Sequence, residues 1–203
     1  MRYRTTIRGH RSKITDLAIN ENNSVLASSS EDGWVMFWDI TPLQQHAFPY
    51  YHFLGCGCLH TRFICQLKYD SVNHLLYSVA DDGFIHAWNV PLMDPLNPQS
   101  RRNLTENQLC VFSLNHGKST NDNNAQIDNS VLFCDLSPDG QYLASGTRSG
   151  TVFIWRLPVV TRDAIGYISR VHLLRYIKPS ILNCSHVVSL FRHFMVMRRV
   201  LIL

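Results

Sequence analysis

Four residue types recur at identical spacing in two parts of this 203-residue chain, and no other feature restricts its fold as strongly. From His10, a serine follows 18 residues on, an aspartate 22 on and a tryptophan 28 on, and the same types follow His60 at the same offsets. The two sets are His10, Ser28, Asp32 and Trp38, and His60, Ser78, Asp82 and Trp88. Self-similarity at a fixed period is typical of repeat architectures, in which each copy is one supersecondary unit.

A third copy is anchored on Trp155. Ser145 lies ten residues before it, as in the other two copies, and Val131 matches the first apolar residue of each copy. The same counting places Ile127 at the histidine position and Ser149 at the aspartate position. We therefore expect a degenerate third repeat with an incomplete set of polar groups and a less rigid structure.

Each copy has the pattern of short strands joined by turns. In the first, residues 14–19, 25–28 and 34–38 are rich in apolar, β-branched and aromatic residues. Asp32-Gly33, before the third of these strands, is a hairpin signal because glycine tolerates a positive φ. Residues 1–157 keep no helical period for long, so the sequence predicts an all-β fold.

The motifs Gly9-His10, Leu26-Ala27-Ser28, Asp32-Gly33 and Trp38-Asp39 resemble one WD repeat. This resemblance implies that each repeat supplies one four-stranded blade of a β-propeller. It also implies that the histidine, serine, aspartate and tryptophan of a repeat form a buried hydrogen-bonded tetrad. Such a tetrad is physically reasonable, because a buried indole N–H, hydroxyl and carboxylate all need partners.

The chain is thus predicted to be a partial propeller of three repeats. Residues 3–7 have the pattern of an outer strand of a further blade, so the sequence is interpreted as a fragment. The predicted boundaries are a WD-repeat region over 1–157, with repeats at about 9–40, 59–90 and 127–157, an irregular insertion over about 91–126, and a tail over 158–203.

The tail differs in composition from the rest of the chain. It carries seven Lys and Arg against one acid, Asp163, whereas residues 1–157 hold 12 basic and 14 acidic residues. Residues 189–203 are apolar with basic interruptions, which predicts a helix or disorder, and the basic residues exclude a transmembrane span. The tail is interpreted as an aberrant terminus, or alternatively as a basic amphipathic helix for a membrane or a partner.

Open blades predict a chain that folds poorly and associates with itself or with chaperones. The alternative is that the tail folds back and caps the third blade.

No catalytic, cofactor or metal site is predicted. The segment Cys56-Gly57-Cys58-Leu59-His60 has possible metal ligands, but no second ligand pair stands at a suitable spacing. His10 or His60 could act as a general base, yet an active site is rarely copied once per repeat. The six cysteines are scattered, which favours a reducing compartment.

The first copy further resembles the second repeat of the bromodomain and WD-repeat proteins, through Arg8-Gly9-His10 and residues 14–22. The prolines at 91, 95 and 98 and the segment Ser130–Cys134 follow the same family. That resemblance implies a nuclear interaction scaffold that joins transcriptional regulation to cell shape, with chromatin proteins or a cullin-type ubiquitin ligase adaptor as partners. No direct nucleic-acid contact is predicted. The alternatives are a cytoplasmic WD-repeat adaptor in ubiquitination, trafficking or RNA processing, and a membrane-associated protein anchored by the tail.

Overall fold

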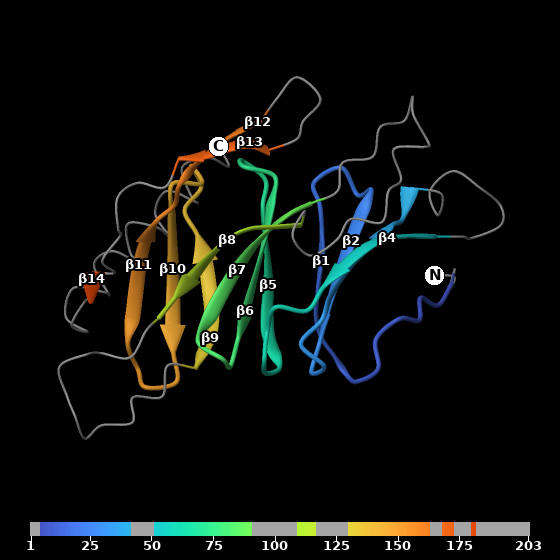
Figure 1. The fold of residues 1–203 in the computed structure, drawn as a ribbon, viewed down its shortest axis with the longest axis horizontal. Helices are drawn as coiled ribbons and strands as arrows, with labels where there is room; N and C mark the ends of the chain where they lie inside the picture. Colours follow the sequence, from blue (N-terminus) through green and yellow to red (C-terminus); the bar gives the residue numbers. More distant parts are fainter. Residues whose placement is uncertain are drawn as a thin grey trace, which may run out of the picture.

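Three four-stranded antiparallel sheets dominate the computed structural model, which describes residues 5–41, 51–90, 109–116, 130–162, 168–172 and 180–181 (Figure 1). Blade 1 consists of β1 (Ile14–Ile19), β2 (Val25–Ser30), β3 (Val35–Asp39) and β4 (His52–Gly57). Blade 2 consists of β5 (Ile64–Asp70), β6 (Leu75–Ala80), β7 (Phe84–Asn89) and β8 (Cys110–Asn115). Blade 3 consists of β9 (Val131–Leu136), β10 (Tyr142–Thr147), β11 (Val152–Arg156) and β14 (Ser180–Ile181).

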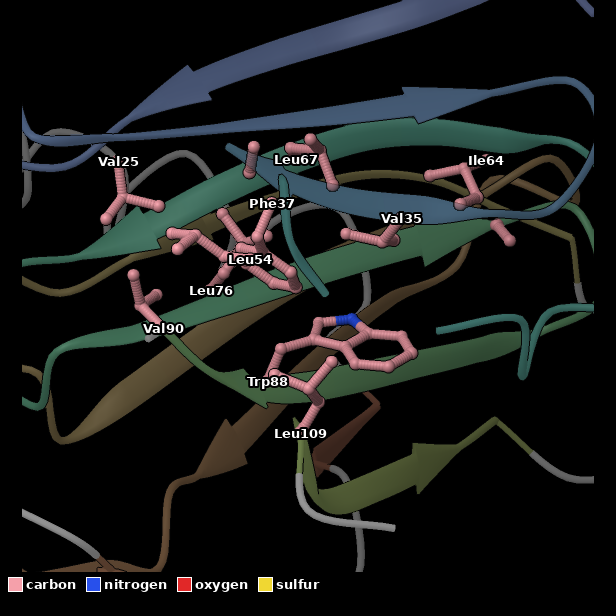
Figure 2. Close-up of a cluster of buried hydrophobic side chains, with 12 residues drawn as sticks. Val25, Val35, Phe37, Leu54, Ile64, Leu67, Leu76, Trp88, Val90 and Leu109 are labelled. Atoms are coloured by element: carbon pink, nitrogen blue, oxygen red, sulfur yellow. The ribbon is translucent and has the colours of Figure 1, made fainter. Parts of the chain in front are cut away.

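The first strands of the three blades lie side by side, β1 against β5 and β5 against β9 (Figure 1). Apolar side chains fill both spaces between the sheets. Val25, Val35 and Phe37 of blade 1 pack with Ile64 and Leu67 of blade 2 (Figure 2). A second core, formed by Leu75, Tyr77, Val79, Ile85, Ala87, Val131, Cys134, Leu143, Trp155 and Leu157, joins blades 2 and 3.

A bulge in the first strand of blades 1 and 2 links each of these blades to the next. The register shifts between Ile14 and Asp16 in β1 and between Ile64 and Gln66 in β5. Asp16 Oδ2 accepts a hydrogen bond of 2.8 Å from the backbone N–H of Leu67. Gln66 Oε1 accepts one of 2.7 Å from the backbone N–H of Cys134. These polar contacts fix the blades relative to each other, because a buried N–H without an acceptor is costly.

Glycine is required where blades 1 and 2 meet. A Cβ added at Gly57 would lie 2.2 Å from the indole of Trp88, closer than any side chain tolerates. Gly57 is the last residue of β4, so the outer strand of one blade lies directly against the tryptophan of the next.

The predicted all-β fold is confirmed, and the strand boundaries show three differences. Residues 5–7, expected to be a strand, are not one, because no described strand lies alongside to pair with them. β4 lies beyond the predicted end of the first repeat at residue 40. β8 lies inside the predicted irregular insertion, so the prediction for 91–126 is wrong at Cys110–Asn115, where the segment adds the fourth strand to blade 2.

The described part of the tail forms strands, so the expectation of helix or disorder is wrong there. β12 (Val159–Arg162) pairs with β13 (Ile168–His172), and β14 pairs with β11. The β-branched residues of β12 and the open edge of β11 favour pairing over a helix. The segment 189–203, for which a helix was predicted, lies outside the described residues.

Candidate functional site: the tetrad end of the blades

The structure brings the four predicted residues of blade 2 together. His60 Nδ1 lies 3.0 Å from Asp82 Oδ2, and His60 Nε2 lies 2.7 Å from Ser78 Oγ. The indole N–H of Trp88 donates to the same hydroxyl oxygen over 2.7 Å. All four side chains are buried, so each polar group is paired inside the protein.

Asp82 also closes the hairpin that carries it. Its carboxylate accepts hydrogen bonds from the backbone N–H groups of Phe84 and Thr61, at 3.0 and 2.9 Å. Burial by itself raises the pKa of Asp82, but the hydrogen bond and charge of His60 and the two backbone donors outweigh it. The pKa of Asp82 therefore lies below its usual value, and the carboxylate stays ionised.

The set in blade 1 is assembled in the same way, with looser geometry. His10 Nε2 lies 2.8 Å from Ser28 Oγ, to which the Trp38 indole donates over 3.0 Å. His10 Nδ1, however, lies 3.4 Å from Asp32 Oδ2, and the Asp32 side chain is more exposed than that of Asp82. Blade 2 therefore holds the tighter network of the two.

In blade 3 the histidine comes from an unexpected place. His116 Nε2 lies 2.7 Å from Ser145 Oγ, and the Trp155 indole donates to that hydroxyl over 2.8 Å. Ile127, which spacing placed at this position, lies outside the described residues. The third repeat thus has its histidine, and the expectation that this position lacks one is wrong. The reason is that the additional residues between His116 and β9 lengthen the spacing between this histidine and Trp155.

The carboxylate of blade 3 is replaced by backbone. His116 Nδ1 lies 3.0 Å from the carbonyl oxygen of Gly83, in the β6–β7 turn of blade 2. Ser149, at the aspartate position, contacts the hydroxyls of Thr147 and Thr151 instead, at 2.8 and 3.3 Å. Burial lowers the pKa of His116 to about 4, so this imidazole is neutral at pH 7.

A further histidine, which the sequence analysis did not single out, lies beside the blade 2 tetrad. The rings of His86 and His60 are 4.3 Å apart between centroids, and His86 Nδ1 lies 2.7 Å from Ser113 Oγ. Burial and the charge of His60 lower the pKa of His86 to about 4. Met36 and Phe153 stand at the same position in the other blades, so spacing from the tryptophans gave no signal for a polar residue here.

The turn of blade 2 joins blade 3 through one carboxylate. The buried Asp81 side chain accepts a hydrogen bond from Arg62 Nη1 at 2.9 Å and forms an ion pair with Arg148 Nη2 at 3.2 Å. The hydroxyl of Ser130, the residue before β9, donates to the same carboxylate. Burial raises the pKa of Asp81, and the hydrogen bonds from Ser130 and Arg62 with the charge of Arg148 lower it further than burial raises it.

Acidic and basic side chains are distributed unequally at this end of the sheets. We term it the tetrad end because the histidine of each blade contacts a residue of the β2–β3 or β6–β7 turn there. The carboxylates of Asp81 and Asp82 point inward, whereas Arg62 and Arg148 are more than half exposed. Lys13 is also exposed, although it contacts Glu31 at 3.5 Å. The loops therefore present cationic groups to solvent above buried acids.

The Ser-His-Asp connectivity of blade 2 is that of a hydrolase triad, but its environment is not. Ser78 is completely buried, and its oxygen already contacts both His60 and the Trp88 indole. A substrate carbonyl has no access to it. The network is suited to holding three strands together rather than to nucleophilic attack.

Two thiols, Cys65 of blade 2 and Cys134 of blade 3, are likewise unsuited to nucleophilic chemistry. Burial raises the pKa of Cys65 to about 11 and that of Cys134 to about 12, so both are protonated at pH 7. Cys56 and Cys58 form no disulfide. Within the described residues, Cys56, Cys58 and His60 do not form a metal-ligand group, and no other such group is found. In the part of the chain that the structure describes, no helix is long and apolar enough to cross a membrane.

Comparison with known proteins matches two segments of the chain to the WD repeat. The family model "WD domain, G-beta repeat" matches residues 1–39 and 118–156. The chain is 28% identical over 155 residues to "Protein lethal(2)denticleless" of Drosophila melanogaster, covering 72% of this chain and 17% of that protein. It is 28% identical over 169 residues to human "Striatin-4", covering 74% of this chain and 18% of that protein. The chain therefore spans less than a fifth of the length of these relatives.

A solved chain of a "Crystal Structure of Mitotic Checkpoint Complex" has the same fold, with a TM-score of 0.50 and 19% identity over 73% of this chain and 35% of that one. The family model misses the second repeat, which has the most complete tetrad of the three. Three four-stranded blades, each with a Trp indole bonded to a buried serine, agree with the two matched segments: the chain is an all-β, partial propeller, and its residues 1–39 and 118–156 match the WD repeat.

Proposed function

We propose that this chain is a non-catalytic scaffold that binds other proteins through the tetrad end of its blades. The observation that carries the proposal is the placement of its polar networks. Histidine, serine and tryptophan occupy the same buried position in each blade, where they hold strands together, and the exposed cations Lys13, Arg62 and Arg148 lie on the loops around them. Binding residues placed on loops of a rigid framework are the usual arrangement for recognition.

The matched family supports the same conclusion, since its propellers are generally non-catalytic and mediate protein–protein interactions. The solved chain with this fold belongs to the Mitotic Checkpoint Complex.

Charge reversal at the two ends of the blades tests the scaffold proposal. Partners of the tagged full chain would be identified by cross-linking and mass spectrometry. We expect Arg62→Glu combined with Lys13→Glu to remove most specific partners. The matched control, Glu21→Lys combined with Asp139→Lys, changes charge at the opposite turns and should keep them. Equal partner sets for both double variants would contradict the proposal.

The setting we propose is the nucleus, where the chain would serve a chromatin-associated regulator of transcription that also influences cell shape. The support is the resemblance of the first repeat and of Ser130–Cys134 to the bromodomain and WD-repeat proteins. Proximity labelling with the full chain in nuclear and cytoplasmic fractions tests this. Histones and transcription factors should dominate the labelled set. A set dominated by trafficking, RNA-processing or ubiquitin-ligase proteins in the cytoplasm would instead support the alternative adaptor role.

A further inference from the structure

Two arginine side chains from different blades meet at one buried carboxylate. Arg62 Nη1 lies 2.9 Å from Asp81 Oδ2, and Arg148 Nη2 lies 3.2 Å from Asp81 Oδ1. The Asp81 side chain is only 4% exposed, whereas those of Arg62 and Arg148 are 65% and 53% exposed. We call Arg62 and Arg148 the arginine pair: one carboxylate holds both, and more than half of each side chain faces solvent.

The arginine pair results from a change of charge at one turn position. Glu31, Asp81 and Arg148 are equivalent, because the backbone N–H of each donates to the carbonyl oxygen of the residue before the first strand of its own blade. Blades 1 and 2 have an acid at this position and blade 3 has a cation, so Arg148 pairs with the acid of blade 2. This junction therefore holds two cations and one acid, a net charge of +1.

The folded chain holds the arginine pair in position through contacts of its own. The Ser130 hydroxyl donates to the Asp81 carboxylate, and the Arg148 N–H donates to the Ser130 carbonyl over 2.9 Å. Groups that are fixed beforehand lose less conformational entropy when a ligand binds. A guanidinium also matches a carboxylate closely, because its N–H groups can form two parallel hydrogen bonds with the two oxygens.

An exposed aromatic side chain lies beside the arginine pair. Phe63 follows Arg62 in the chain, is 39% exposed, and accepts the Asp81 N–H at its carbonyl oxygen over 3.2 Å. The turns at the opposite end of the blades instead expose the acids Glu21 and Asp139, which would repel an anionic segment. Cations next to an aromatic ring thus distinguish the tetrad end from the opposite end.

We propose that the arginine pair binds a carboxylate in an acidic segment of a partner protein, and that an apolar residue near that carboxylate packs on Phe63. The inference rests on the proposed scaffold function and adds the chemistry of the partner. Its basis is charge complementarity, since clusters of arginine recognise acidic motifs in proteins. Asp81 is a positioning residue, because it holds both guanidinium groups without contacting the partner.

An array of synthetic peptides of balanced composition, probed with the tagged full chain, measures the preference directly. We expect the bound peptides to be enriched in aspartate or glutamate next to an apolar residue. Arg62→Gln and Arg148→Gln should each weaken the best peptide by more than about fivefold in fluorescence anisotropy, since each removes a charge-assisted hydrogen bond.

Arg11→Gln is the matched control. Arg11 is exposed at the same end, where its N–H donates to Asp32, but it lies outside the arginine pair. This variant should change affinity by less than about twofold, as expected for a distant surface charge. Circular dichroism should show the same fold for all three variants, because the replaced side chains are exposed. An equal loss in the control would overturn the assignment to the arginine pair.

A double-mutant cycle separates a direct contact from general attraction. Replacing the acid of the best peptide by its amide should weaken binding to the wild-type chain and have a much smaller effect on Arg62→Gln. Equal effects on both would overturn the contact. Neutral or basic bound peptides, a requirement for phosphoserine, or an empty array alongside specific cross-linked partners would overturn the inference and leave the scaffold function intact. A chain without specific cross-linked partners would overturn both.

Discussion

His116 Nε2 lies 2.7 Å from Ser145 Oγ although 29 residues separate them, compared with 18 between His60 and Ser78. The histidine follows the last strand of blade 2 and contacts both that blade, at Gly83, and the serine of blade 3. The polar cluster of blade 3 is therefore built across the blade boundary, and its stability depends on how the two blades pack.

Replacement of His116 tests this cluster. We expect His116→Ala to reduce the free energy of unfolding by about 2 to 4 kcal/mol, since it leaves a cavity and removes a buried partner of Ser145. Lys13→Ala, on an exposed side chain with a weak surface pair, should change it by less than about 0.5 kcal/mol. Urea unfolding followed by tryptophan fluorescence gives both values. Similar midpoints would argue against a structural role for His116.

Asp82→Ala should destabilise the protein far more than Ser149→Ala, although the two residues stand at equivalent positions. Removing Asp82 leaves His60 and two backbone N–H groups without their acceptor, at a cost of about 3 to 5 kcal/mol. Ser149 contacts only threonine hydroxyls, and its loss costs about 1 kcal/mol. Equal urea midpoints would contradict the assignment of Asp82 to a tetrad.

Gly57→Ala and Gly146→Ala form a matched pair within strands. The first substitution drives a methyl group into the Trp88 indole, and we expect a loss of about 1 to 3 kcal/mol. The second has nothing within 4 Å, so it should be neutral or stabilise by about 0.5 kcal/mol, because alanine is less flexible than glycine in the unfolded chain. Thermal unfolding of both variants checks the contrast, which fails if Gly57→Ala melts like wild type.

Stability should fall as the pH is lowered from about 6.5 to about 4. His86 and His116 titrate near 6.5 when unfolded, but burial lowers both pKa values to about 4 in the folded protein. In that window only the unfolded chain binds the protons, so acid favours unfolding, by about 3 kcal/mol per histidine at its lower end. The lowered pKa of Asp82 changes the free energy of unfolding only below about pH 4, so it does not obscure the contribution of the two histidines.

His86→Met removes the contribution of one of the two histidines to the pH dependence of stability. Met36 stands at the same position in blade 1, so the side chain fits the sheet. We expect the slope of unfolding free energy against pH between 6.5 and 4 to decrease by about half, with little change at pH 7. An unaltered slope in urea titrations across this range would mean that His86 does not titrate as its burial requires.

The strands and the first two tetrads were predictable because the turns inside a blade have fixed lengths. Ser28 and Trp38 pair across β2 and β3, so a ten-residue spacing is dictated by the hairpin between them. The same rule located Ser145 relative to Trp155. Local geometry and spacing agree wherever no insertion intervenes.

His116 was missed because its distance from the tryptophan is not fixed by a hairpin. Residues 117–129 intervene between it and blade 3, so counting back from Trp155 reached Ile127 instead. A usable signal was present: His116 directly follows the strand Cys110–Asn115, much as His60 follows β4. The strands of the tail had no such signal, since β14 forms only because β11 offers an open edge.

The residues on either side of the segment 117–129, His116 and Ser130, both form hydrogen bonds with the β6–β7 turn. His116 is bonded to the Gly83 carbonyl, and Ser130 to Asp81. The packing of blades 2 and 3 therefore does not depend on the number of residues between His116 and Ser130. Doubling that number costs only about 0.6 kcal/mol in closure entropy. This position should accept a foreign peptide or a small guest domain, which makes the chain a ready host for grafted sequences and places any graft beside Arg148.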